Sequence, residues 1–143
     1  MTSKRIDNYG KVNRNRVVAF TWNQKKYFGF EGDSLASAML ANDIKIVGRS
    51  FKYHRPRGIM SCGVEESGAL ITIGQEEKRD PNVRATTQEL YEGLVASGQN
   101  AYPNVNFDLG ALSGLLGRFF AAGFYYKTFI GLPPFEWGKG TKA

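Results

Sequence analysis

The sequence predicts an α+β fold in which a small mixed sheet packs over a single helix. Three observations carry this prediction: a pair of short strands near the start, one helix after them, and two further strands beyond a Gly-rich region. This order of elements is that of a β-grasp. The chain has 143 residues, of which 42% are hydrophobic and 13% are aromatic. That composition suffices for one domain with a buried core and excludes a wholly disordered chain.

Two strands that form a hairpin are predicted near the start of the chain. Residues 16–22 (RVVAFTW) are dominated by β-branched and aromatic side chains, and residues 27–30 (YFGF) continue this pattern after a polar turn. Residues 1–15 are polar, basic and rich in Asn, so we expect them to form a flexible arm. The β-grasp domain is therefore expected to begin at residue 16.

One short helix is predicted over residues 34–42. Ser34, or Asp33 before it, can cap the N-terminus of this helix. A brief strand, residues 44–47, is expected to follow the helix. The apolar face that packs across the sheet recurs at helical spacing and consists of Leu35, Ala38 and Met39.

Two more strands complete the predicted sheet. Residues 69–73 (ALITI) are typical of a buried strand, and residues 83–90 (VRATTQEL) of a further one. The segment between them (GQEEKRDPN) is expected to form a turn or loop. We expect the domain, residues 16–95, to be followed by residues 96–143, a linker and aromatic extension that packs on the domain or on regions downstream. A short helix is expected within residues 107–132.

A basic segment with interleaved aromatic residues covers residues 49–58 (RSFKYHRPRG). Clustered Arg and Lys side chains can grip phosphate or carboxylate groups, and aromatic rings can stack on bases. Alternatively, this is a surface loop whose cations pair with acids of a neighbouring domain or subunit. The net charge of +6 is compatible with both readings. The candidates for an interface or an anion site are Arg49, Lys52, His54, Arg55 and Arg57.

Residue patterns predict no catalytic site. Cys62 and His54 are the only cysteine and the only histidine, which excludes a disulfide framework, a multi-cysteine zinc site and a His-rich metal site. Nucleophilic catalysis by Cys62 lacks an identifiable third group that would orient a base. The adjacent Glu65 and Glu66 on an irregular loop are expected to face water rather than to act as paired acid–base carboxylates.

Signatures of nucleotide binding and of membrane insertion are also missing. The GKGT near the end fails as a phosphate-binding loop because Pro133 stands where that motif needs Gly, and the chain has no G-x-G-x-x-G. The most apolar stretch, residues 110–132, contains Arg118 and Lys127, and the N-terminus lacks the apolar region of a secretory signal. We therefore expect a cytoplasmic protein with no membrane partner.

Several segments resemble, in the same order, the start of the α subunit of heterotetrameric sarcosine oxidase and of related α-type subunits such as that of N-methylglutamate dehydrogenase. These segments are EGDSLASAMLAN, GRSFKYHRPRGIMSCG, PNVRATTQELYEG and FYYKTF. The resemblance covers about residues 17–129. It implies a β-grasp module similar to plant-type two-iron two-sulfur ferredoxins, placed at the N-terminus of a longer oxidoreductase chain.

Relatives that keep the cluster hold it through C-x4-C-x2-C and a fourth cysteine on the later strand. Aligned on the 69–73 and 83–90 strands, this pattern places Ser61, Glu66, Ala69 and Thr86 at the four ligand positions. None of these is a cysteine, and Cys62 lies one residue from the first position. The resemblance therefore implies a ferredoxin-like fold that has lost its metal, with no cofactor in this segment.

For the complete enzyme, the resemblance implies oxidation of sarcosine at a flavin, one-carbon transfer to tetrahydrofolate and formation of hydrogen peroxide. Its cofactors would be FAD, FMN and NAD, and its partners the downstream α domains and the β, γ and δ subunits. The present chain is expected to be a non-catalytic structural or assembly domain of that enzyme, with no nucleic-acid partner. The alternative is a stand-alone module that binds an anion or nucleic acid through residues 49–58.

The aromatic extension is expected to contact a partner surface. Eight of the aromatic residues lie between Phe119 and Trp137, in a segment broken by Gly and Pro. Such a segment cannot bury so many rings on itself, and exposed apolar patches of this kind mark interfaces. We expect the isolated chain to self-associate or to have a mobile C-terminus beyond about Ile130.

Overall fold

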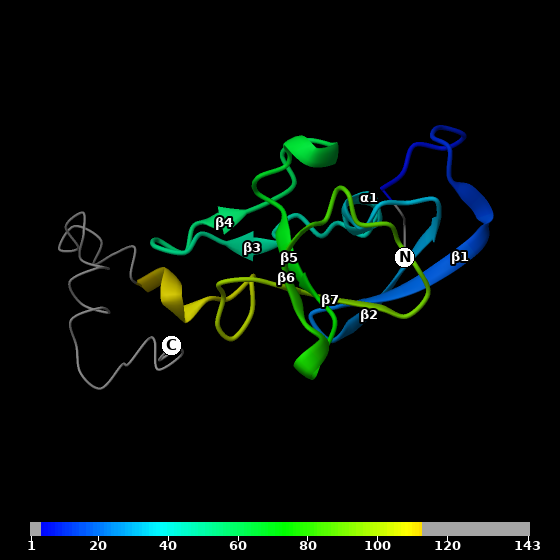
Figure 1. Cartoon of the computed structure of the whole chain (residues 1–143). Coiled ribbons are helices and arrows are strands. Elements are labelled where there is room, and N and C mark those ends of the chain that lie inside the picture. The colour runs from blue at the N-terminus through cyan, green and yellow to red at the C-terminus, as the bar shows by residue number, and fades with distance from the viewer. Residues whose placement is uncertain (1–3, 113–143) are drawn as a thin grey trace, which may run out of the picture.

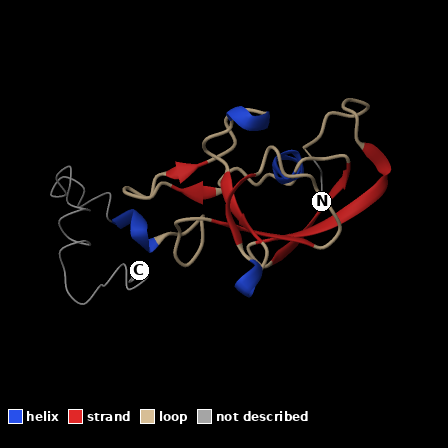
Figure 2. Ribbon diagram, in the orientation of Figure 1, coloured by secondary structure: helices blue, strands red, loops and turns tan. Residues whose placement is uncertain are grey.

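A five-stranded mixed sheet organises residues 4–112, the part of the chain that the computed structural model describes (Figure 1). The strand order is β2-β1-β7-β5-β6, in which β1 and β7 run parallel and the other neighbours run antiparallel. Figure 2 shows a helix lying over this curved sheet and a small second sheet beside it. The arrangement confirms the predicted α+β, β-grasp fold. The strands of the main sheet are β1 (Asn13–Trp22), β2 (Lys25–Glu31), β5 (Leu70–Ile73), β6 (Asp80–Arg84) and β7 (Leu94–Gly98).

The predicted hairpin is present, and both of its strands are longer than expected. β1 begins at Asn13 rather than at residue 16, with an irregularity in its register between Asn13 and Val17. Asn23 and Gln24 connect the strands with φ angles of 45° and 67°, which is the backbone twist that two-residue hairpins need. The buried side of the hairpin includes Phe20, whose ring stacks on Tyr27 with centroids 5.9 Å apart.

The helix α1 (Leu35–Ala41) confirms the predicted helix and its apolar face. The Ser34 hydroxyl accepts a hydrogen bond from the Ser37 backbone N–H, so Ser34 is the N-cap. The helix lies close to β2 at Gly29, where an added Cβ would come within 2.9 Å of the Ala38 Cβ. The side chains that are 0% exposed on its inner face are Leu35, Ala38 and Met39.

The strand β7 lies at the centre of the sheet, although its sequence does not predict a strand. It pairs with β1 through Phe20 and Leu94, and with β5 through Ile71 and Gly98. Residues 83–90 were expected to form a strand, but β6 ends at Arg84 and the chain turns after it. The sheet therefore extends from residue 13 to residue 98, beyond the predicted limits of 16 and 95.

The expected strand over residues 44–47 is absent from the structure. Instead, β3 (Gly48–Arg49) pairs with β4 (Pro56–Arg57) in the small second sheet. The Val47 N–H donates to the Arg57 carbonyl, and the paired strand begins at Gly48, directly after the expected range. This small sheet supports the basic segment at its tip.

The N-terminal segment contacts the helix region, within the stretch that was expected to be a flexible arm. The Arg5 guanidinium donates to both carboxylate oxygens of the buried Asp33, at 2.9 and 2.5 Å. The Lys4 N–H donates to the Ala41 carbonyl at the C-terminal end of α1. Residues 4 and 5 are therefore tied to both ends of the helix.

Within residues 4–112, the remaining elements are three short 3₁₀ helices: η1 (Gly63–Glu65), η2 (Glu76–Lys78) and η3 (Leu109–Ala111). The η3 turn falls in the segment where a short helix was expected. The aromatic extension over residues 119–137 lies outside the described residues, so its predicted contacts stay a prediction. Among the described residues, no helix has the length and apolarity needed to cross a bilayer.

Candidate functional site

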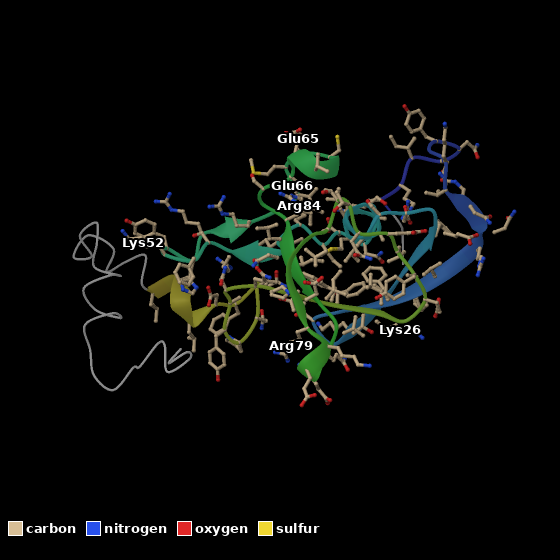
Figure 3. All side chains as sticks on the ribbon, in the orientation of Figure 1. Lys26, Lys52, Glu65, Glu66, Arg79 and Arg84 are labelled. Carbon is tan, nitrogen blue, oxygen red and sulfur yellow. The ribbon has the colours of Figure 1, made fainter. Side chains whose placement is uncertain are left out.

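Three of the four predicted cluster positions lie in the loop of residues 58–69, which connects β4 to β5 and carries η1. The fourth, Thr86, lies just after β6. Figure 3 shows this loop projecting from the sheet, with Glu66 and Arg84 near its base and Glu65 at its outer end. The backbone N–H groups of Ser61 and Ala69 both donate to the Glu66 carboxylate. The Thr86 hydroxyl donates to the Gly63 carbonyl at 2.6 Å. The four positions are thus close in space, although the Ala69 side chain has no ligating atom and the Thr86 hydroxyl is used in the bond to Gly63.

The carboxylate of Glu66 is the centre of this loop. Its side chain is 1% exposed, and each of its oxygens accepts two backbone hydrogen bonds. Oε2 accepts from Met60 and Ser61 at 2.7 and 2.8 Å, and Oε1 accepts from Gly68 and Ala69 at 2.5 and 3.0 Å. The expectation that both carboxylates of this pair face water is therefore wrong for Glu66, while Glu65 is exposed.

The hydrogen bonds of Glu66 determine its protonation. Burial raises the pKa of the Glu66 carboxyl, since a charged group is poorly solvated there. The backbone N–H groups of Ser61, Met60, Gly68 and Ala69 favour the charged form more strongly, so the pKa falls from 4.5 to about 2. Glu66 is consequently a carboxylate at neutral pH.

Contacts with the end of β6 hold the loop in place. The Ala85 N–H donates to the Ala69 carbonyl at 3.0 Å, and Arg84 Nε donates to the Glu66 carbonyl at 3.2 Å. Position 68 needs glycine because the backbone of Gly58 lies very close to it. An added Cβ would lie 2.7 Å from the Gly58 carbonyl oxygen. The loop is therefore a packed structure with a polar centre.

The residues of this loop do not fit a two-iron two-sulfur cluster. Such a cluster is held by four thiolates, or by two thiolates and two imidazoles. The four positions offer two hydroxyls, one carboxylate and one methyl group, and the methyl of Ala69 is 0% exposed in the core. Cys62 is exposed, and within residues 4–112 no group of three potential metal ligands occurs.

Sequence reasoning missed the role of Glu66, and one signal for it was present. Residues 58–69 contain Gly, Ser and Ala around two adjacent glutamates, and such a loop has many backbone N–H groups that no regular element pairs. A buried donor needs an acceptor. The two glutamates cannot be told apart by composition, since only the fold decides which of them faces inward.

The basic segment 49–58 divides into an inner and an outer part. Arg49, predicted as an interface residue, instead faces the domain's own chain. Its guanidinium donates to the carbonyls of Val105, His54 and Asn106 at 2.8, 3.1 and 3.4 Å. Arg49 therefore joins the small sheet to the segment after β7.

His54, also predicted at the interface, pairs with the buried Asp108. Its Nδ1 lies 2.7 Å from Asp108 Oδ2, and Asp108 Oδ1 accepts from the N–H groups of Tyr102 and Gly110. Burial raises the pKa of the Asp108 carboxyl, but the Tyr102 N–H and His54 outweigh this effect and hold it below its ordinary 3.8. His54 has a φ of 50°, a left-handed conformation that is uncommon for a residue with a Cβ, and these contacts stabilise it.

Substitution of Asp108 by Ala is expected to lower the free energy of unfolding by about 1–3 kcal/mol, because buried N–H donors lose their acceptor. Urea denaturation measures this loss, and hydrogen exchange should show faster exchange at Tyr102 and Gly110. Asn106→Ala is the matched control, since its side chain is exposed on the same segment. Equal midpoints for the two variants would contradict a stabilising role for Asp108.

The outer part of the basic segment faces solvent. The Arg55 and Arg57 side chains are exposed. Lys52 and Arg55 both lie over the Tyr53 ring, each 5.1 Å from its centroid. These cations form a compact positive surface at the tip of the β3–β4 sheet.

Comparison with known proteins supports the same fold. A family model described as a 2Fe-2S iron-sulfur cluster binding domain matches residues 15–101. The solved structure of L-proline dehydrogenase from P. horikoshii matches with a TM-score of 0.50 and 22% identity, over 64% of this chain and 17% of that one. This likeness concerns the fold alone.

Curated relatives extend the similarity to most of the chain. The chain is 55% identical over 130 residues to sarcosine oxidase subunit alpha of Rhizobium meliloti (strain 1021), which is 91% of this chain and 13% of the relative. It is 42% identical over 90 residues to sarcosine oxidase subunit alpha of Corynebacterium sp. (strain U-96), which is 61% of this chain and 9% of the relative. On these matches, the chain belongs to the family of 2Fe-2S iron-sulfur cluster binding domains and is homologous to a region of sarcosine oxidase alpha subunits.

Proposed function

We propose that this chain is a non-catalytic structural and assembly domain at the N-terminus of a sarcosine oxidase alpha subunit. The observation that carries the proposal is the 55% identity over 130 residues to such a subunit, of which the chain spans only 13%. In this proposal the complete enzyme demethylates sarcosine at a flavin, passes the one-carbon unit to tetrahydrofolate and forms hydrogen peroxide. FAD, FMN and NAD belong to the rest of the enzyme.

The loop of residues 58–69 supports the non-catalytic part of the proposal. A cluster-bearing domain would carry electrons through thiolate-bound iron. Here the residue at the second ligand position, Glu66, is buried and uses its carboxylate for four backbone hydrogen bonds. The domain therefore contributes shape and surface, while the reaction takes place elsewhere in the enzyme.

The alternative, a stand-alone module that binds an anion or nucleic acid, is weakened by the position of two candidate residues. Arg49 and His54 are used by contacts with residues 105–108. The exposed cations at the tip of the β3–β4 sheet are better matched to a small acidic patch on a neighbouring domain or subunit. We assign Lys52, Arg55 and Arg57 to that contact.

Reversal of the charges of Arg55 and Arg57 to Glu is expected to weaken assembly with the β, γ and δ subunits and leave this domain folded. Both side chains are exposed, so each ion pair contributes only about 0–1 kcal/mol to the domain's own stability. Size-exclusion chromatography of the co-expressed subunits at low salt measures assembly. Sarcosine-dependent peroxide formation per flavin in the assembled fraction measures chemistry.

The matched control is the double variant Lys25→Glu with Lys78→Glu, which changes the net charge equally at two exposed positions elsewhere. It should assemble like the wild type. Normal assembly of the Arg55 and Arg57 variant would remove the basic surface from the interface. Full assembly with lost turnover per flavin would contradict a non-catalytic role.

A further inference from the structure

We infer that the loop of residues 58–69 is an anion-binding loop whose ligand is the protein's own Glu66 carboxylate. This carboxylate organises the loop in place of the iron–sulfur cluster for which the family is described. The inference concerns how the loop is built, and it holds whether or not the domain acts in assembly.

Backbone donors from two separate parts of the loop converge on Glu66. Met60 and Ser61 precede η1, and Gly68 and Ala69 follow it, yet all four N–H groups point at one carboxylate within 2.5–3.0 Å. Successive backbone N–H groups that face one point form a concavity that binds anions. In this chain the concavity is closed around a side chain of the loop itself.

The charge of the Glu66 carboxylate is compensated by the backbone rather than by a counter-ion. Among the ion pairs of the described residues, none involves the Glu66 carboxylate. Arg84 reaches the loop, but it donates to the Glu66 backbone carbonyl rather than to the carboxylate. A buried charge without a counter-ion must be stabilised by hydrogen bonds, and here the backbone supplies them. The loop is thus an anion site by its own geometry.

The anion site formed by these N–H groups is fully occupied by Glu66. Both oxygens of Glu66 accept two hydrogen bonds, and the residue is 1% exposed. Any external anion or metal centre would have to displace Glu66 from these donors. On the outward side of the loop, Met60 and Val64 are 80% and 70% exposed. The loop therefore reaches its folded form without iron.

Removal of the carboxylate by Glu66→Ala tests the inference directly. In the 143-residue chain, hydrogen exchange at the amides of Met60, Ser61, Gly68 and Ala69 should become faster by about tenfold or more, because their acceptor is gone. Sodium acetate, which supplies a free carboxylate, should restore slow exchange in a saturable way. Sodium chloride at equal ionic strength should restore much less. Glu65→Ala is the matched control and should leave all four amides protected.

A second variant keeps the test decisive if Glu66→Ala does not fold. Glu66→Gln keeps the size of the side chain but offers one carbonyl oxygen, and its NH₂ group would face N–H donors. Two of the four amides should then keep their protection and two should lose it. Unchanged protection of all four amides in Glu66→Gln would overturn the inference. So would a folded Glu66→Ala whose four amides stay protected without acetate, or do not respond to it.

Metal uptake by the wild-type chain tests the statement that the loop folds around Glu66 and does not take up iron. After incubation with ferrous iron and sulfide under reducing conditions and desalting, iron and sulfide should be far below stoichiometric. Near-stoichiometric iron and sulfide with a visible spectrum would overturn it. Neither measurement involves the other subunits, so failure here is distinguishable from failure of the proposed assembly role.

Discussion

The wild-type chain should be more stable than its Glu66→Gln variant by roughly 3 kcal/mol at neutral pH, and this difference should disappear as the pH falls toward 2. The folded protein holds the pKa of Glu66 at about 2, against an ordinary value of 4.5. One pH unit of pKa difference corresponds to about 1.4 kcal/mol. The depressed pKa means that the folded state binds this proton less readily than the unfolded state. The stabilisation is therefore complete above about pH 4.5 and is lost progressively below it.

Urea denaturation of both chains at a series of pH values measures this difference. Other acids titrate in both chains, including Asp108, whose lowered pKa acts in the same direction. Subtracting the free energy of unfolding of Glu66→Gln from that of the wild type at each pH removes the contribution of these other acids. Glu65→Gln serves as the control, because that side chain is exposed and should follow the wild-type curve. Parallel curves for the wild type and Glu66→Gln would show that the four backbone hydrogen bonds do not favour the charged carboxylate.

The elements that the sequence predicts well depend on local signals. The first hairpin has β-branched and aromatic residues on both sides of a two-residue turn, and α1 has Ser34 as its N-cap with apolar residues at helical spacing. These signals lie within ten residues of the element that they specify. They place the helix to within one residue of its observed ends.

The strand β7 shows why the rest of the sheet could not be predicted in the same way. Its sequence, LVASG, has few residues with a strong strand preference. It is nevertheless paired on both sides, with β1 in parallel and β5 in antiparallel register. These partners lie far away in the chain, so the backbone hydrogen bonds that make it a strand exist only in the folded sheet. Residues 85–90 illustrate the reverse, since local β preference there is overridden by the turn toward Asp33 and α1.

The candidate sites follow the same rule. The resemblance placed four cluster-ligand positions, none of them a cysteine, around the loop of residues 58–69, and the residue pattern marked residues 49–58 as an interface or an anion site. Neither could show that Glu66 turns inward while Glu65 turns outward, or that Arg49 and His54 reach residues 105–108. Those orientations depend on contacts between segments that are distant in sequence. In the sequence, the basic segment looks like a continuous cationic surface. In the fold, Arg49 and His54 hold the domain together, and the other cations face solvent.

The substitution Leu35→Ala is expected to lower the free energy of unfolding by about 2–5 kcal/mol. Leu35 is the first residue of α1 and is 0% exposed, so its side chain lies wholly within the core. The cost depends on how far the surroundings can collapse into the cavity. Ala36, Ala38 and Ala85 belong to the same buried cluster and have no flexible side chain to fill the space. We therefore expect a value in the upper half of this range.

The variant Leu40→Ala is the matched control, because it makes the same chemical change on the same helix. Leu40 is 46% exposed, and Ala has a slightly better helix preference than Leu. Its cost should therefore remain below about 1 kcal/mol. Urea denaturation of the three chains should place Leu40→Ala close to the wild type and Leu35→Ala well below it. Equal losses for the two variants would mean that α1 is not packed on the sheet through the face that carries Leu35. A large loss confined to Leu35→Ala would show that α1 packs on the sheet through the face that carries Leu35.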